Sequence, residues 1–411
     1  MRLKRETWAL ICISTAAAFL LGGYEFLRSS TNTLFQAAYG TENLPLITAL
    51  MPLGLIFILY LYGWLLSRLG ARRTLLFTSL ASGVVIAACY LEIRAGSKIA
   101  TGVAYIFREA YIVLLIEQYW SFLNSTFGQD IARKLNGPVA GIASIGSISG
   151  GLLLSYLAEP LGTAAMLLFA AGAVIPAALF SELAYRKCGE PKPTLQEKEG
   201  KQGQLGIKVL SHSPILVLLF TLVMVSQIVS TVLSLSFQTI LHAEMTNLDQ
   251  QTAFSGQFFA LLNGASAFFQ FVAAPFLLTT VSLKWIHAVI PLIHIAAATV
   301  LLIHPSLKTA GIAYLIFKAI DYSIFRAAKE ILYIPLSFDA RYRSKELIDV
   351  FGYRFSKGGA SLILTILQKI GIVIMPVYSW TALGAACIWF TLVIPLVRHL
   401  PHDSISKSPK H

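Results

Sequence analysis

The chain has 411 residues, of which 56% are hydrophobic and only 13% are charged, and its mean hydropathy is +0.70. Soluble domains carry about 25% charged residues, so this composition excludes a soluble protein and predicts an all-α polytopic membrane protein. The net charge of +12 does not indicate a nucleic acid as partner, because the basic residues fall mostly in short loops, where cytoplasmic loops of membrane proteins collect them.

The first half of the chain predicts six spans, because a membrane-spanning helix needs about 20 apolar residues. A short basic leader, MRLKRE, precedes an apolar run from Trp8 to Leu27 with no small-residue cleavage site after it. We therefore predict a first span entered from the cytoplasm rather than a signal peptide. The other predicted spans cover about 45–66, a stretch ending near 93, 99–123, 137–158 and 162–185.

The longest polar segment runs from Arg186 to Ser213 and is rich in Lys, Gly and Pro, which predicts a linker between two halves. The chain has room for about 12 spans in all, so we predict a six-helix half over 1–185, a cytoplasmic linker over 186–213, a second six-helix half over 214–398 and a cytoplasmic tail over 399–411. The spans of the second half are predicted at about 214–241, 251–280, 285–304, 310–336, 349–373 and 376–397.

Basic residues are distributed unevenly between the two sides that these spans define. Both termini and the loops on their side hold about 21 Lys and Arg, whereas the opposite loops hold Arg94, Lys98 and Lys308. Because positive charge stays on the cytoplasmic side, both termini are predicted inside. The leader lacks transit-peptide composition, so we expect a multi-pass protein of the bacterial cytoplasmic (inner) membrane, and a monomer.

Two six-span halves joined by a cytoplasmic linker are the layout of the major facilitator superfamily. The loop between spans two and three resembles the signature of that superfamily, in which basic residues and a glycine turn latch helix ends. An ordinary basic inside loop is the alternative, since Ser67 stands where the usual acidic partner would be. The residues that carry the resemblance are Gly63, Arg68, Gly70, Arg72 and Arg73.

Two similar stretches, one in each half of the sequence, support the division into halves. Residues 108–151 and 318–361 lie roughly 210 residues apart, and each holds an ionisable span, a charged inside loop and a span rich in small residues. Small residues let membrane helices approach closely, so we expect most of these glycines to act in packing. They are Gly141, Gly146, Gly150, Gly151, Gly358 and Gly359.

Charged residues cluster in or beside two apolar runs between Lys318 and Ser361. A charge at the centre of a membrane costs at least about 2.5–3.5 kcal/mol, so these side chains either pair with one another or line a wet pathway. Charges at helix ends that reach the membrane surface are the alternative. Arg326 shares a helix face with Lys329 and is spaced to pair with Glu330. The cluster comprises Asp321, Arg326, Lys329, Glu330, Arg354 and Lys357.

Fewer candidates fall in the first half. Glu117 lies well inside span four, where an acidic residue is either functional or part of a structural ion pair, and Asn124 lies near it. Arg28 ends span one, three residues after Glu25, and is either self-paired or a cation of a central cavity.

The motifs of catalysis and metal binding are not found in the sequence. It holds no nucleophile elbow, no phosphate-cradling glycine loop and no paired metal ligands. Its four cysteines are scattered without a disulfide framework. We therefore expect no enzyme activity, no catalytic residues, no cofactor and no metal.

Several of these residues resemble a known family, the ATP/ADP translocases of plastids and intracellular bacteria. In the second half the match runs through Lys329-Glu330, Tyr333 to Leu336, Lys345, Ile348 to Val350, Lys357 to Gly359 and Ser361. In the first half it is carried by Leu27-Arg28, Thr33-Leu34, the run from Pro45 to Phe57, Glu117 with Trp120, and Ala132 to Lys134. The resemblance implies exchange of nucleotides across a membrane by alternating access, with Glu117 and Lys357 among the residues that bind substrate.

The sequence also departs from the family pattern. Thr31 and Asn32 stand where the family has a lysine and an aspartate, and Arg326 stands where it has an aspartate. In span seven, Ser234 and Gln238 take the places of a glutamate and a lysine. Because phosphate groups favour contacts from Arg and Lys, these changes are expected to weaken triphosphate binding or to change the substrate.

Three functions remain open at this point: a nucleotide exchanger, a proton-coupled transporter of another organic or phosphorylated anion, and a membrane receptor or assembly partner without transport. For a transporter we expect cations of both halves, with Arg108 among them, to meet an anionic small molecule. Tyr322 is either an aromatic that stacks on a base or an interfacial anchor. The predicted substrate-binding residues are Arg28, Glu117, Asn124, Tyr322, Arg326, Lys329, Arg354 and Lys357, and the predicted coupling residues are Glu117, Asp321 and Glu330.

Overall fold

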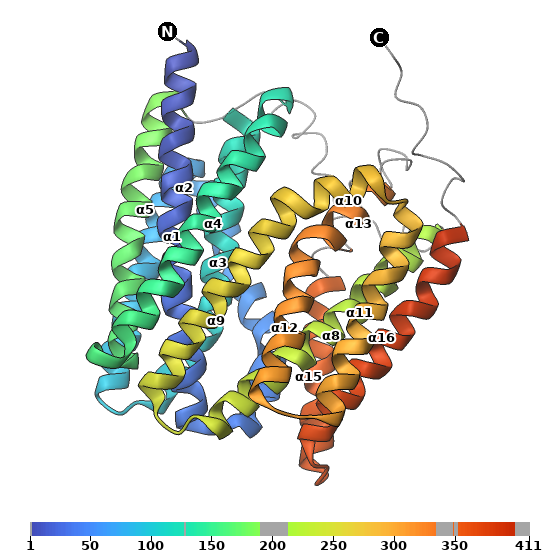
Figure 1. Ribbon diagram of the computed structural model, residues 1–411. Coiled ribbons are helices and arrows are strands. Elements are labelled where there is room, and N and C mark those ends of the chain that lie inside the picture. Colours follow the sequence, from blue (N-terminus) through green and yellow to red (C-terminus); the bar gives the residue numbers. More distant parts are fainter. Residues whose placement is uncertain (1, 127–128, 190–212, 334–347, 349–351, 399–411) are drawn as a thin grey trace, which may run out of the picture. The chain divides into compact units, whose positions relative to one another are not determined.

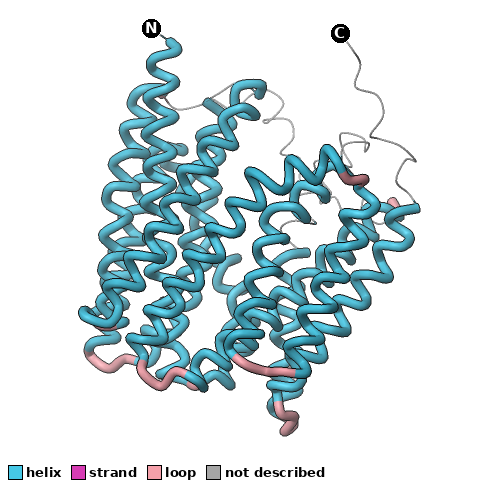
Figure 2. The backbone as a smooth tube through the Cα atoms, viewed as in Figure 1, coloured by secondary structure: helices cyan, strands magenta, loops and turns pink. Residues whose placement is uncertain are grey.

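The computed structural model of the chain describes residues 2–126, 129–189, 213–333, 348 and 352–398. Within these residues every regular element is a helix (Figure 2). The helices that come before the predicted linker are α1 (Arg2–Tyr39), η1 (Thr41–Asn43), α2 (Leu44–Arg94), α3 (Lys98–Thr126), α4 (Gln129–Leu161), η2 (Thr163–Ala165) and α5 (Met166–Cys188).

Helix α2 contains two predicted spans, with a break between them at Gly70. The backbone of Gly70 has φ 75° and ψ 171°, which is not helical. Glycine adopts such positive φ values without the steric cost that a Cβ would add. The turn falls just after the predicted end of span two at Leu66, so the 51 residues of α2 form two helical rods.

The helices that follow the predicted linker include two short π-helical segments, η3 and η4, each with an α-helix before and after it. The elements are α8 (Pro214–Glu244), α9 (Leu248–Phe268), η3 (Phe269–Ala273), α10 (Ala274–Thr280), α11 (Leu283–Ile303), α12 (Leu307–Ile320), η4 (Asp321–Phe325), α13 (Arg326–Tyr333), α15 (Tyr353–Lys369) and α16 (Ile374–Arg398).

The chain forms two compact units. The first comprises residues 1–43, 50–202 and 245–264. Its central helix is α1, which packs against α3, α4 and α5 (Figure 1). Small residues allow the approach of α4 to α1: a Cβ added to Gly146 would meet the backbone of Ala18, and one added to Gly150 would meet the backbone of Gly22. Two of the glycines predicted for packing therefore pack as expected.

The second unit comprises residues 44–49, 203–244 and 265–411. Its central helix is α8, which packs against α12, α15 and α16, while α11 packs against α12 and α16. Each unit is thus centred on the first long helix of its half, and the neighbours of that helix come from the fourth, fifth and sixth predicted spans of the same half. The helices α1 and α8 are the most buried of the apolar spans in the described part of the chain.

The described residues include nine helices that are long and apolar enough to cross a membrane. One of them, Thr41–Arg94, accounts for two spans because of the Gly70 turn. The shorter α12–η4–α13 and α15 continue the series, in agreement with a polytopic all-α fold of about 12 spans in two six-helix halves. The predicted boundary at 186–213 falls largely outside the described residues, so the division into domains stays a prediction.

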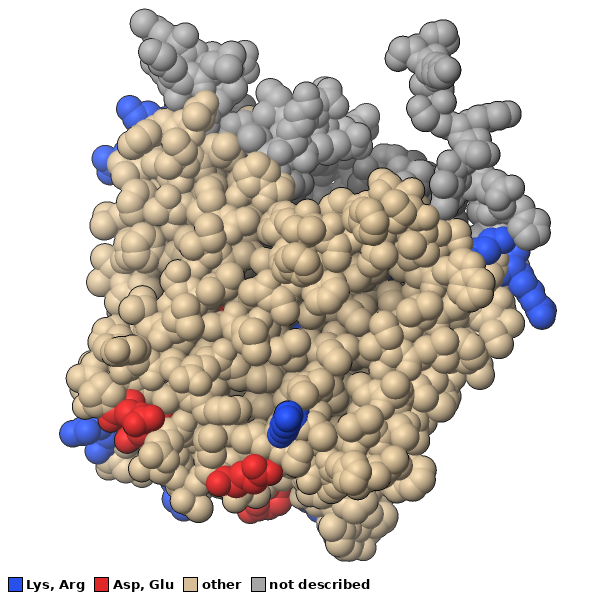
Figure 3. Space-filling model, in the orientation of Figure 1, with Lys and Arg blue, Asp and Glu red and all other residues tan. Residues whose placement is uncertain are grey.

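Apolar side chains cover the outer faces of the helices. In the space-filling view most of the described surface carries neither Lys and Arg nor Asp and Glu (Figure 3). Exposed side chains include Leu53, Phe57 and Tyr60 on α2 and Trp285 on α11. Since an aqueous surface of this composition would be unfavourable, these faces are the ones that contact lipid.

Candidate functional site

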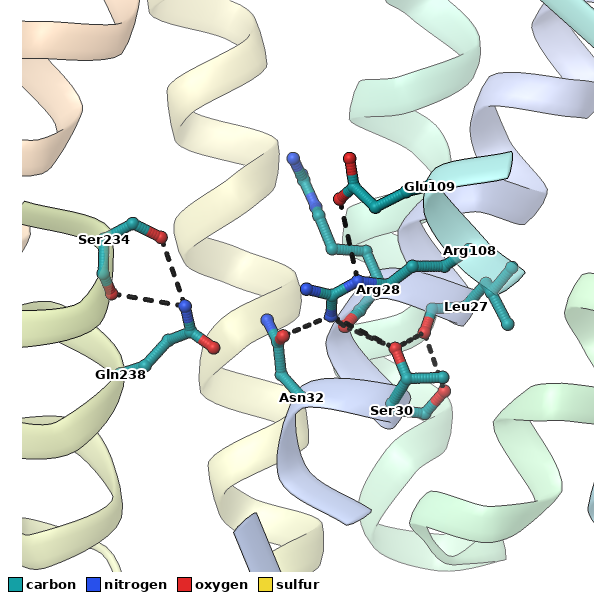
Figure 4. A network of polar contacts seen from close by, with 9 residues as sticks. Leu27, Arg28, Ser30, Asn32, Arg108, Glu109, Ser234 and Gln238 are labelled. Carbon is teal, nitrogen blue, oxygen red and sulfur yellow. Dashed lines mark hydrogen bonds and ion pairs between the residues drawn. The ribbon is translucent and has the colours of Figure 1, made fainter. Parts of the chain in front are cut away.

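Arg108 lies on α3 at the centre of a polar network in the first unit (Figure 4). One of its terminal nitrogens donates to the Asn32 side-chain oxygen, to Thr31 Oγ1 at 3.2 Å and to the carbonyl oxygen of Arg28 at 3.3 Å. Its Nε lies 3.8 Å from the Glu109 carboxylate, and its guanidinium lies 3.7 Å from the centre of the Tyr105 ring. This buried cation is therefore held mainly by neutral oxygens and an aromatic face.

Arg28 forms a second cluster with Glu25, one turn earlier on α1. The two side chains form an ion pair, and Glu25 is only 2% exposed. Asn263 on α9 donates to Glu25 Oε1 at 2.9 Å, and the Arg28 guanidinium lies 3.5 Å from the centre of the Phe259 ring. The structure shows the Glu25–Arg28 pairing, with added contacts that no local pattern in the sequence signals. The role of Arg28 in substrate binding stays a prediction.

Two predicted site residues of the first half cannot be placed. Glu117 and Asn124 both belong to α3, but their side chains lie outside the described residues. Their proposed roles stay predictions.

The second unit gathers charges around the junction of α12 and η4. Asp321, the first residue of η4, is buried, and Gln227 on α8 lies in hydrogen-bonding range of its carboxylate. The positive charges that act on Asp321 come from Lys318, Lys329 and Arg326. This predicted coupling carboxylate therefore lies among cations inside the helical unit.

The exposed residues of α12, η4 and α13 differ in chemistry from those of the lipid-facing helices. Between Ala313 and Tyr333 only Tyr322 and Arg326 are exposed, and both carry polar groups. A helix face in contact with lipid exposes apolar side chains, and an arginine there would be costly. This face of α12, η4 and α13 is therefore suited to a water-filled pathway.

The remaining predicted residues of the second half lie on two helices, Lys329 and Glu330 on α13 and Arg354 and Lys357 on α15. Lys329 is buried, whereas Glu330, Arg354 and Lys357 are half-buried, and all four make interactions within the chain. Arg326 and Lys329 differ in exposure, so they do not present their charges to the same surroundings. In the part of the chain that the structure describes, Arg326 forms no ion pair with Glu330.

The basic loop predicted as a latch has an acidic partner that the sequence analysis missed. Arg72 Nε donates to Glu182 Oε2 at 3.0 Å, and Arg186 Nε donates to Glu182 Oε1 at 2.9 Å. Ser67, at the position of the usual acid, instead donates to the carbonyl oxygen of Trp64. The acid comes from α5, over 100 residues away from Arg72, which is why local spacing did not reveal it.

Two neutral residues that depart from the family pattern contact each other. Gln238 on α8 donates to the side-chain oxygen of Ser234 at 3.1 Å and to its carbonyl oxygen at 3.2 Å (Figure 4). The two residues thus form a neutral hydrogen bond within one helix.

The fold is that of the major facilitator superfamily. A crystal structure of a point mutant of the nucleoside transporter NupG superposes with a TM-score of 0.72 at 11% identity, over 94% of this chain and 99% of that one. A D-xylose–proton symporter superposes with a TM-score of 0.68 at 15% identity, over 97% and 99%. The chain therefore shares the fold of these transporters.

The comparisons of sequence confirm the resemblance to the ATP/ADP translocases. The family model of the TLC ATP/ADP transporter matches residues 294–399, which include the charged cluster of the second half. ADP,ATP carrier protein 3 of Rickettsia felis is 22% identical over 74% of this chain and 68% of its own length. ADP,ATP carrier protein 1 of Rickettsia conorii is 33% identical over 19% of this chain and 15% of its own length.

Proposed function

We propose that this protein exchanges nucleotides across a membrane by alternating access. The proposal rests on one observation: between Ala313 and Tyr333 the exposed residues are Tyr322 and Arg326, and the apolar residues are buried or half-buried. A nucleotide combines a planar base with anionic phosphates. Its base matches an exposed aromatic ring, and its phosphates match a guanidinium.

Other cations of the second unit support the same proposal. Lys329 is buried on the helix that carries Arg326, and Arg354 and Lys357 lie on α15. Such charges remain in a membrane protein at a considerable cost, which an anionic cargo offsets when it binds. The resemblance to ADP,ATP carriers supports a cargo with phosphate groups.

The proposal also covers the cellular location of the protein and its oligomeric state. The relatives named above are bacterial, and the basic residues favour the side of the termini. We infer that the protein is a monomer of the bacterial inner membrane with both termini in the cytoplasm.

Uptake into proteoliposomes tests the proposal. Labelled ATP, ADP, other nucleotides, nucleosides and phosphorylated metabolites are offered to vesicles that contain or lack internal nucleotide. We expect uptake of at least one nucleotide, with a rate that depends on internal nucleotide. Uptake of a non-nucleotide anion alone, or uptake that internal nucleotide leaves unchanged, would contradict exchange.

A second candidate is proton-coupled transport of another organic anion. It is favoured by two carboxylates buried within the helical units, Glu25 and Asp321, since such groups act in proton relays of transporters. An uncoupler that collapses the proton gradient would abolish uptake by a proton symporter and leave nucleotide exchange unchanged.

A further inference from the structure

Lys318 is a buried cation that is not among the predicted site residues. It lies in the last turn of α12 and is 7% exposed. Its ammonium nitrogen lies 4.7 Å from the centre of the Tyr322 ring and 5.9 Å from that of Phe317. The phenol of Tyr353, the first residue of α15, lies in hydrogen-bonding range. These neighbours are aromatic or neutral, so they do not neutralise the charge.

Asp321, the acid nearest to Lys318 in the sequence, does not form an ion pair with it. Asp321 acts on it electrostatically, but among the described residues no carboxylate oxygen lies within 4.0 Å of the ammonium nitrogen. Asp321 is also engaged with Gln227 and faces Arg326 and Lys329. From Lys318 to Glu330 the chain carries three cations and two acids, which leaves an excess of one positive charge.

The π-helical segment η4 lies between Lys318 and Arg326 and carries Tyr322. It begins directly after α12 and contacts the other π-helical segment, η3, in the same unit. Such segments are rare and occur frequently at functional sites. Tyr322, whose exposed fraction is 37%, comes between buried Lys318 and exposed Arg326 along the helix. A partly exposed aromatic ring therefore borders a buried charge that an anion would compensate.

We propose that Lys318 is the residue that makes this site select phosphorylated cargo over uncharged nucleosides. The inference rests on the nucleotide exchange proposed above. Arg326 makes the first, exposed contact with a phosphate, and Lys318 supplies the buried positive charge that the phosphate compensates beside the Tyr322 ring. A nucleoside can stack on the ring, but it leaves the buried charge uncompensated.

The test compares Lys318→Gln with Lys308→Gln, a control that removes an exposed lysine from the start of the same helix. Inhibition of labelled ADP exchange by adenosine, AMP, ADP and ATP is measured for each variant. We expect the apparent affinity of Lys318→Gln for ADP and ATP to fall at least about tenfold, and that for adenosine to stay within about twofold. The control variant should match wild type throughout.

A purely structural role of Lys318 would lower the amount of folded transporter without changing the preference for phosphate. If Lys318→Gln does not fold, Lys318→Arg and Tyr353→Phe test the role of Lys318 instead. The first variant keeps the charge, and the second removes only the phenolic hydroxyl group that lies near it. Lys318→Arg should keep the preference, and Tyr353→Phe should reduce it by a smaller factor than the loss of the charge.

The outcomes separate the inference from the proposed function. Wild-type protein that exchanges no nucleotide overturns the proposed function. If the wild type exchanges nucleotides but Lys318→Gln keeps the wild-type ratio of ADP affinity to adenosine affinity, only the role of Lys318 is overturned. The same holds for Tyr353→Phe where that variant replaces Lys318→Gln.

Discussion

Buried charges in this protein are stabilised in two different ways. Glu25 and Arg28 neutralise each other, whereas Arg108 is surrounded by the neutral oxygens of Thr31 and Asn32, with Glu109 at 3.8 Å. A cation that is held by neutral acceptors keeps most of its positive field. Of Arg28 and Arg108, Arg108 is therefore the better placed to attract an anion.

Asp321 is expected to limit how tightly the second-half cluster holds an anion. In Asp321→Asn the charge that offsets Lys318, Arg326 and Lys329 is lost. The apparent affinity for nucleotide should rise by about tenfold, and the maximal exchange rate should fall because release slows. The measurement is the concentration dependence of ADP exchange. Glu92→Gln, which changes an exposed acid at the end of α2, is the control, and weaker binding in Asp321→Asn would contradict the expectation.

Glu182 is expected to stabilise the end of α5. Glu182→Gln removes the negative charge that accepts from both Arg72 and Arg186. We expect a loss on the order of 1–2 kcal/mol of local stability, seen as a lower melting temperature in detergent. Glu159→Gln, an exposed acid near the end of α4, should leave the melting temperature unchanged. An equal effect of the two substitutions would assign no role to the Arg72–Glu182 contact.

At the scale of elements, α9 shows how small residues decide packing. A Cβ added to Gly256 would lie 2.7 Å from the carbonyl oxygen of Gly151, and one added to Gly151 would lie 2.8 Å from that of Gly256. These distances are shorter than van der Waals contact, so both glycines are needed for α9 and α4 to approach as they do.

The Gly256→Leu variant is therefore expected to separate α9 from α4. The added side chain should lower thermal stability and reduce exchange by at least about tenfold, since overpacking costs roughly 1–3 kcal/mol. Gly264→Ala, on the same helix, adds a Cβ that would meet no atom within 4 Å and should leave stability and exchange close to wild type. If both variants behave alike, close packing at Gly256 is not required.

The elements also show where sequence reasoning succeeds and where it fails. Apolar length predicted spans such as 99–123 and 285–304, which correspond to α3 and α11. It did not reveal η3 and η4, because one extra residue in a helical turn leaves the apolar run unchanged. The two-helix nature of α2 was predicted because the basic loop interrupts the apolar runs on either side of Gly70.

Only part of the candidate site could be predicted from the sequence. Charges in apolar runs marked Arg28, Asp321 and Arg326, because their cost in a membrane is independent of the tertiary fold. Partners such as Asn263 and Glu182 were missed, since they are ordinary in their own local sequence and become informative only when distant helices meet.

At the scale of the whole molecule, polar contacts at the start of α9 hold it in the first unit. The Asp249 carboxylate accepts from the backbone nitrogen of Thr163 at 2.6 Å and from Thr163 Oγ1 at 2.7 Å. Gln251 donates to the Gln36 side chain at 3.2 Å. Polar contacts of this kind can break and form again when a helix moves.

A disulfide between α9 and η2 tests whether these contacts must break. The hydroxyl oxygens of Thr163 and Thr252 lie 3.0 Å apart, which places the two residues close enough for a Thr163→Cys, Thr252→Cys pair to be bridged. In a protein without the native cysteines, oxidation should reduce exchange by at least about tenfold, and a reductant should restore it. Each single variant is the control, and full exchange in the oxidised double variant would show that α9 stays in place.

The assignment of residues 245–264 to the first unit has a consequence for dissecting the protein. A fragment that ends within 190–212 would lack the helix that covers Gly151 and that supplies Asn263 to Glu25. Two fragments divided there and produced together in one cell should therefore purify as a pair, because each needs surface that the other polypeptide provides.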